Sequence, residues 1–139
     1  MPTHFQPLDS LNRVILGDGL RSGALLSLSA IGLALLGLTP AFSWIPEVPL
    51  LGTAILVPVG ILAWTGWRAA SRSGRLTAGP LTGAVAGTIG GLVAGIAFVI
   101  AGKPALNIAV GLVSGALSGS AIGFAGALLG RNRTGGFRS

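Results

Sequence analysis

Residues 83–123 read GAVAGTIGGLVAGIAFVIAGKPALNIAVGLVSGALSGSAIG, and this stretch decides the fold. Two apolar segments flank Lys103, and each carries a row of glycines at every fourth position. The rows consist of Gly83, Gly87, Gly91, Gly95, Gly111, Gly115, Gly119 and Gly123. Residues four apart lie on one face of an α-helix, and the two rows are equidistant from Lys103. The stretch therefore predicts a helical hairpin, a glycine zipper, with its glycines at matching depths.

A glycine row in a membrane helix predicts a packing surface. Hydrocarbon offers the backbone no alternative hydrogen bonds, so the helix persists despite its glycines. The missing side chains then let another backbone approach closely. The rows either face each other or face another protein, and the sequence leaves both open. Gly90, Gly126 and Gly130 lie off the rows and suggest contacts on further faces.

The hairpin resembles, in its glycine spacing alone, the packed helices of the ring proteolipids of rotary ATPases. That resemblance covers residues 83–123. The carboxylate that these proteolipids carry in mid-membrane has no counterpart here, so ion translocation by their mechanism is not implied.

Composition places the whole chain in a membrane. Of the 139 residues, 51% are hydrophobic and 9% are charged, and the mean hydropathy is +0.83. Long uncharged apolar runs in such a chain predict transmembrane helices. We expect an all-α integral membrane protein with four transmembrane helices. The predicted spans are residues 22–39, 50–67, 80–101 and 105–130, which together form one domain over 22–130.

Two segments flank this domain. Residues 1–21 carry Phe5, Leu8 and Leu11 at helical spacing, and Gly17 to Gly19 are predicted to break the run. This pattern predicts a short amphipathic helix in the membrane interface, with a partly disordered tail as the alternative. Residues 131–139 are predicted to be a basic cytoplasmic tail.

One proline and three tryptophans shape the predicted second helix and its ends. Pro58 lies inside the helix and predicts a kink. Trp44 lies before the helix, and Trp64 and Trp67 lie near its end, as expected of interfacial anchors. The alternatives are a gate or ligand site at Pro58 and a site for an aromatic pigment or quinone at the tryptophans.

Three polar residues lie in the predicted last helix. Asn107 is expected either to hydrogen-bond across to a neighbouring helix or to be hydrated near the interface. Ser114 and Ser118 flank Gly115 and are expected to bond back to carbonyls of their own helix.

The distribution of ionisable residues argues against catalysis. The predicted spans contain no Asp, Glu, Lys, Arg or His, and His4, Asp9, Asp18 and Glu47 are scattered outside them. Acid–base, nucleophilic and metal chemistry all need clustered groups, so we expect no enzyme, no catalytic residue and no metal site. The net charge of +6 comes from residues at the ends of apolar runs, which gives no nucleic-acid-binding face.

The remaining features favour a structural function. We expect a non-catalytic small subunit that stabilises a larger membrane complex, such as a respiratory or photosynthetic one, with other membrane subunits and lipid as partners. The alternatives are a homo-oligomeric pore or carrier for a small solute, and a subunit that holds lipid, quinone or pigment. No cofactor is predicted. Abundant Ala, Gly, Leu and Arg suggest a bacterial inner membrane.

The arrangement of basic residues predicts the orientation in that membrane. Eight arginines lie on one side of the four predicted spans, and Lys103 lies alone on the other. The positive-inside rule then places both termini in the cytoplasm. The chain has no natural cysteine, so a single introduced cysteine can be labelled without background. In intact cells, an impermeant reagent should label a cysteine replacing Lys103 and spare one at either terminus; the reverse pattern would contradict this topology.

Overall fold

The computed structural model describes residues 8–38 and 47–133, and within them the chain is all-helical. The helices are α1 (Leu8–Leu38), α2 (Glu47–Ser73), α3 (Ala78–Ile100) and α4 (Leu106–Arg133). Each is long and apolar enough to cross a membrane. The candidate spans are Leu11–Leu36, Gly52–Ser73, Ala78–Ile100 and Leu106–Gly130. Trp44 and the ends of the two flanking segments lie outside the described residues.

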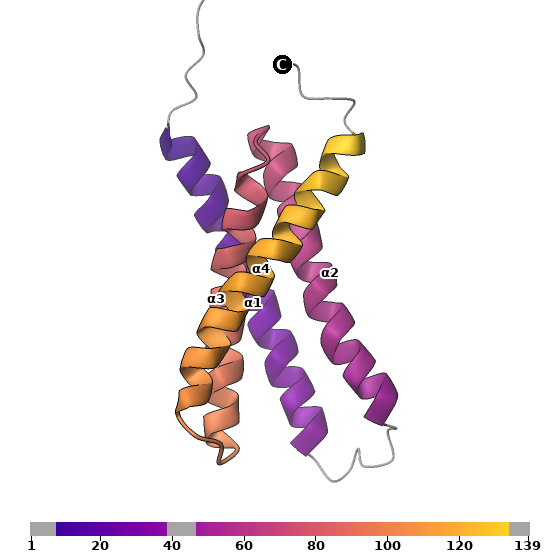
Figure 1. Cartoon of the computed structure of the whole chain (residues 1–139), viewed down its shortest axis with the longest axis vertical. Coiled ribbons are helices and arrows are strands. Elements are labelled where there is room, and N and C mark those ends of the chain that lie inside the picture. The colour runs from indigo at the N-terminus through magenta and orange to yellow at the C-terminus, as the bar shows by residue number, and fades with distance from the viewer. Residues whose placement is uncertain (1–7, 39–46, 134–139) are drawn as a thin grey trace, which may run out of the picture.

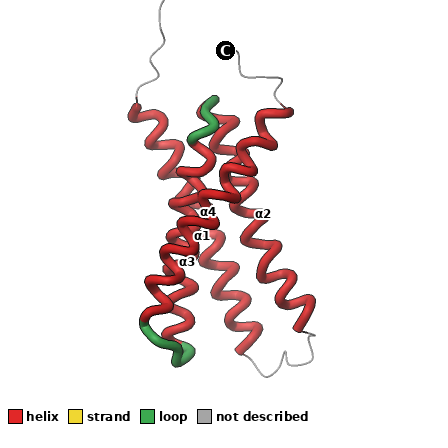
Figure 2. Tube along the Cα trace, viewed as in Figure 1, coloured by secondary structure: helices red, strands yellow, loops and turns green. Residues whose placement is uncertain are grey.

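The helices alternate in direction along the bundle (Figure 1). The start of α1, the α2–α3 turn and the end of α4 lie at one end, and the α3–α4 turn lies at the other. The two described turns are short (Figure 2). We call the first end the arginine end, because Arg13, Arg68, Arg72 and Arg75 lie there. The opposite end is the Lys103 end.

Helix α1 corrects the prediction of a separate interfacial helix ending at Gly17–Gly19. It is continuous from Leu8 to Leu38, and most of it forms a candidate span. The glycine that was expected to break the helix is a contact point instead. A Cβ added at Gly19 would lie 2.9 Å from Cγ1 of Val85, so glycine here lets α1 approach α3. Asp18 is buried and points to α2, as described below.

Helix α2 corrects the prediction that it ends at Trp67. It continues to Ser73, six residues beyond the predicted end. Ala69 and Ala70 are buried there, and the hydroxyl of Ser73 bonds back to the carbonyl of Ala69 at 2.7 Å. The helix ends where Gly74 adopts a φ of 66° and its N–H bonds the carbonyl of Ala70, a common glycine-dependent helix end.

Helix α3 ends in the same way as α2, at a glycine in the left-handed conformation. Gly102 adopts a φ of 81°, and the N–H of Lys103 bonds the carbonyl of Phe98 at 3.0 Å. A left-handed residue at this point reverses the chain within a few residues. It thereby brings α4 back alongside α3.

Large and small side chains are distributed as lipid would require. Ala86 and Ala127 are fully buried, whereas Ile100 and Leu56 are 82% and 70% exposed. A soluble bundle does the reverse, because its core is built from large apolar side chains. With small residues between the helices and large ones outside, the bundle suits a hydrocarbon solvent.

The two glycine rows face each other along α3 and α4. A Cβ added at Gly91 would meet the carbonyl of Gly111 and would lie 3.2 Å from the Cα of Gly115. A Cβ at Gly87 would meet the carbonyl of Gly115 and lie 3.0 Å from the Cα of Gly119. Gly83, Gly87 and Gly91 are each seated between two consecutive α4 glycines, and a Cβ at Gly95 would meet the backbone of Asn107 and Ile108. The helices thus touch through their backbones.

The glycines off these rows join the hairpin to the other two helices. A Cβ at Gly90 would lie 2.9 Å from the Cβ of Leu26 in α1. A Cβ at Gly126 would lie 2.9 Å from the Cα of Ala63 in α2, and one at Gly130 would meet Trp67. These positions, which suggested external partners, are therefore filled within the chain. Among the described residues α1 and α4 make no contact, whereas α2 and α3 each contact every other helix, so α1 and α4 lie on opposite sides of α2 and α3.

The backbone contact predicts a sharp difference between two Gly→Ala variants. In Gly91→Ala the new methyl group meets the backbone of Gly111, which cannot rotate away, so the helices must separate. We expect a loss of about 1–3 kcal/mol in unfolding free energy, measured by titration with a denaturing detergent. Gly60→Ala is the matched control, because a Cβ there has nothing within 4 Å. Equal stability of the two variants would contradict the contact.

Candidate functional site

A cavity of about 570 Å³ lies between the helices in the half of the bundle nearer Lys103. It is lined along α3 from Gly87 to Ala101, along α1 from Leu26 to Ala34 and along α2 from Ala54 to Leu62. Helix α4 adds Gly115 and Ser118. In Figure 1 the α3–α4 hairpin separates from α1 and α2 towards this end, and the cavity lies among the halves of these helices nearer Lys103.

The lining of the cavity is apolar. Apart from Ser29 and Ser118, the described residues that form it are Ala, Gly, Leu, Phe and Pro. The hydroxyl of Ser29 donates to the carbonyl of Leu26 at 2.8 Å, and that of Ser118 donates to the carbonyl of Ser114 at 2.7 Å. Both protons are therefore used within their own helices. The cavity offers a ligand dispersion contacts rather than hydrogen bonds.

The space is open to the surroundings of the bundle, so the solvent around the helices can enter it. Water does not fill it well, because a buried water needs two to four polar partners. Hydrocarbon is the solvent that matches this lining.

The cavity is closed towards the arginine end. Leu26, Leu62 and Ala86 form a buried apolar cluster at this point, and Ile61 and Ile122 pack against it. Above the cluster, the hydroxyls of Thr65 and Ser22 are hydrogen-bonded at 2.7 Å, and both residues are buried. The cavity is therefore a slot with one closed end, which gives no support to the alternative of a pore through the bundle.

A polar clamp joins α1 to α2 at the arginine end. It consists of Asp18 and Ser22 on α1, and Thr65, Arg68 and Arg72 on α2. Nη1 of Arg72 donates to Oδ1 of Asp18 at 3.3 Å, and Nε of Arg68 lies 4.0 Å from the same oxygen. Asp18 is 6% exposed, while half of the Arg72 side chain reaches solvent. Oδ2 of Asp18 is buried and accepts no hydrogen bond from the described residues.

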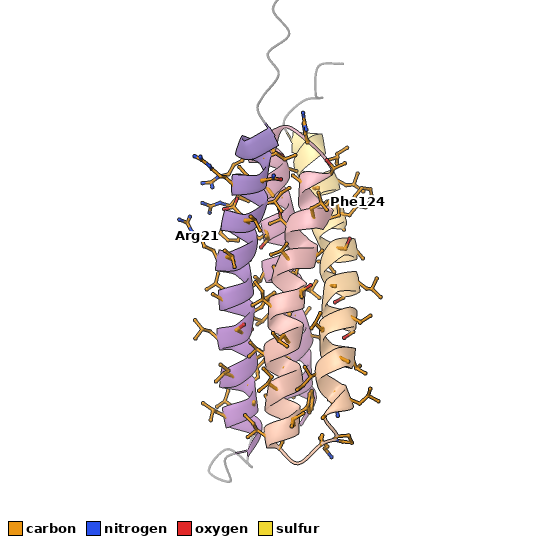
Figure 3. All side chains as sticks on the ribbon, turned by 90° about the vertical axis from the view of Figure 1, so that its left-hand side faces the viewer. Arg21 and Phe124 are labelled. Carbon is orange, nitrogen blue, oxygen red and sulfur yellow. The ribbon has the colours of Figure 1, made fainter. Side chains whose placement is uncertain are left out.

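The length of α1 is compatible with a membrane boundary near the clamp. Twenty residues separate Asp18 from the end of α1 at Leu38, which is about 30 Å of helix and equals the thickness of a bilayer core. With that boundary, the arginine side chains would reach the headgroups while their stems stay in lipid. Arg21 projects outward from α1 in this part of the bundle (Figure 3). Arg68 lies over the ring of Trp64, with Cζ 5.1 Å from its centroid.

Of the predicted polar and kink residues, only Pro58 and Ser118 line the cavity. Pro58 lies inside α2, and the kink stays a prediction. Nδ2 of Asn107 donates to the carbonyl of Pro104 at 2.9 Å, a local bond at the start of α4 that does not join two helices. Ser114 bonds the carbonyl of Gly111 at 3.3 Å.

Trp64 and Trp67 are partly exposed on the arginine half of α2. They do not line the cavity, so it gives no support to a pigment or quinone site at the tryptophans. The two lie where anchors at a membrane interface would lie, and that role stays a prediction.

Sequence reasoning missed both the cavity and the clamp. The clamp left a weak signal: Asp18 and Ser22 are four residues apart, as are Arg68 and Arg72, so each pair lies on one helix face. The prediction that Gly17 to Gly19 end a helix hides this spacing, because it places Asp18 outside a helix. Within the described residues, no group of three His, Cys, Asp or Glu side chains is arranged to hold a metal ion.

The fold and the site define a class, a four-helix bundle suited to multiple membrane crossings, with an apolar slot between its helices. Comparison of the chain with models of protein families, with curated proteins and with solved structures finds no match.

The clamp predicts a measurable coupling between α1 and α2. Asp18→Asn and Arg72→Gln each remove one charge of the pair while keeping side-chain size. In a double-mutant cycle we expect a coupling of about 1 kcal/mol, modest because Arg72 is half exposed. Detergent-induced unfolding of the four proteins gives this value. Strictly additive effects would show that the two side chains do not interact.

Proposed function

We propose that this protein is a non-catalytic, multi-pass protein of a bacterial inner membrane that holds an apolar molecule between its helices. The observation that carries the proposal is the slot of about 570 Å³, with its apolar lining and internally satisfied hydroxyls. Most small-molecule sites have volumes of about 300–1,000 Å³. The ligand classes to be distinguished are lipid, quinone and pigment.

The hairpin supplies the rigid wall of this site. We propose that α3 and α4 act as a glycine zipper, which keeps the wall fixed because the backbones are already in contact. Gly87, Gly91 and Gly115 belong to the contact and also line the slot. The clamp joins α1 to α2 at the arginine end. The slot lies among the halves of α1, α2 and α3 nearer Lys103.

The orientation follows from the placement of charge. Among the described residues, the basic side chains other than Lys103 lie towards the arginine end, which we place at the cytoplasmic face. The slot then opens towards the outer leaflet. The cysteine-labelling experiment described above for the termini and Lys103 tests this orientation.

Filling the slot tests the proposed function. Ala94 lines the slot on α3, and Ala94→Phe would place a ring in its volume. The purified wild-type protein, extracted with organic solvent, is expected to release a bound apolar molecule that this variant lacks. Ala121→Phe is the matched control, since Ala121 is exposed on α4 and does not line the slot. A bound molecule retained equally by all three proteins would contradict the function.

A subunit of a larger membrane complex is the second candidate. It is favoured by α2, where Gly52 and Gly60 have nothing within 4 Å of an added Cβ. Such unoccupied small residues allow a helix of another protein to approach. The test is purification from the native membrane in mild detergent. A stoichiometric protein partner that is lost in Gly60→Leu would support this candidate, and a protein that purifies alone would contradict it.

A further inference from the structure

We propose that the molecule in the slot is a phospholipid of the leaflet at the Lys103 end, with one hydrocarbon chain inserted between α1, α2 and α3. This inference rests on the proposed function and names the ligand class. It follows from the polarity of the slot, its shape and the end at which it opens.

Polarity favours a hydrocarbon chain over a quinone or a pigment. A ring ligand with carbonyl groups or a central metal is oriented by a few polar groups of its site. Here the hydroxyls of Ser29 and Ser118 already donate to the carbonyls of Leu26 and Ser114. The other described lining residues have no polar side-chain atoms. An alkyl chain needs no such partner, so the slot satisfies it fully.

Shape favours a single chain. The lining spans nine residues of α1, from Leu26 to Ala34, and fifteen residues from Gly87 in α3 to Ala101 just after its end. These stretches are about 12 and 21 Å long at the rise of an α-helix. One leaflet contributes about half of a 30 Å hydrocarbon core. The slot therefore has about the depth of one leaflet, which matches the length of a single hydrocarbon chain.

The direction of entry follows from the two ends. Leu26 and Leu62 close the slot towards the clamp, and both are at least 95% buried. At the opposite end the lining reaches Ala101, two residues before the exposed Lys103 in the turn. A chain that enters there leaves its phosphate at the level of this ammonium group. Lys103 is the one cation among the described residues of that end, and it suits a phosphate.

The experiment uses the full-length protein in nanodiscs made of phosphatidylcholine that carries a diazirine in mid-chain. Irradiation of the wild-type protein should label peptides that line the slot, between Gly87 and Phe98. Ala94→Phe should lower this labelling by about tenfold or more, because its ring takes the place of the chain. Ala94→Leu should give a smaller loss, and Ala121→Phe should leave labelling at the wild-type level. Size-exclusion profiles confirm that each variant is folded.

Three results would overturn the inference, and they differ in what they say of the proposed function. If Ala94→Phe is photolabelled at the slot as strongly as the wild-type protein, no hydrocarbon chain occupies the slot. If organic extraction also finds no bound molecule that the wild-type protein carries and this variant lacks, the proposed function is contradicted as well. If Ala94→Phe instead loses an extractable quinone or pigment, the function stands and the phospholipid assignment fails.

Discussion

The arrangement of the four helices depends on direct contact between the backbones of α3 and α4. Gly83, Gly87 and Gly91 each lie between two glycines of the α4 row, so neither helix can slide or turn without a clash. In water glycine would weaken both helices by about 1 kcal/mol per residue. In hydrocarbon the backbone must stay hydrogen-bonded, so the same residues become useful as close contact points. The hairpin is the rigid part to which α1 and α2 are attached.

Attachment of the outer helices explains why a slot exists at all. Helix α1 approaches α3 at Gly19 and Gly23, both in its arginine half. Helix α2 approaches α4 at Gly66 and through Gly126, again towards the arginine end. The clamp adds a polar contact at the same end. These approaches lie in the arginine half of the bundle, and the slot lies in the half nearer Lys103.

The sequence was sufficient for the features that depend on local periodicity. Four apolar helices and the hairpin about Lys103 could be predicted, because spacing of four and long apolar runs are read directly from neighbouring residues. Helix ends were less accurate. The segment after Trp67 looked polar, yet Ala69 and Ala70 are buried and Gly74 provides the actual end. Whether Asp18 belongs to a loop or a helix depends on Arg68 and Arg72, about fifty residues away.

The slot could not be predicted from the sequence for a similar reason. Its residues, such as Ala34, Ala54 and Ala94, are ordinary small side chains in three different helices. Nothing in their local pattern separates an alanine that packs against a neighbour from one that lines a space. That difference arises from how the helices pack against one another, which contacts between distant residues determine. Function inferred from the absence of ionisable groups therefore pointed to partners outside the chain, whereas most glycine faces are filled within it.

The most direct test of this account is an NMR measurement of proton–proton contacts in protein labelled only at glycine. The account predicts nuclear Overhauser cross-peaks between Hα protons of opposite rows, from Gly87 to Gly115 and Gly119 and from Gly91 to Gly111 and Gly115. These contacts require no substitution and are specific to backbones that touch. An otherwise assigned spectrum without any cross-peak between the two rows would contradict the account.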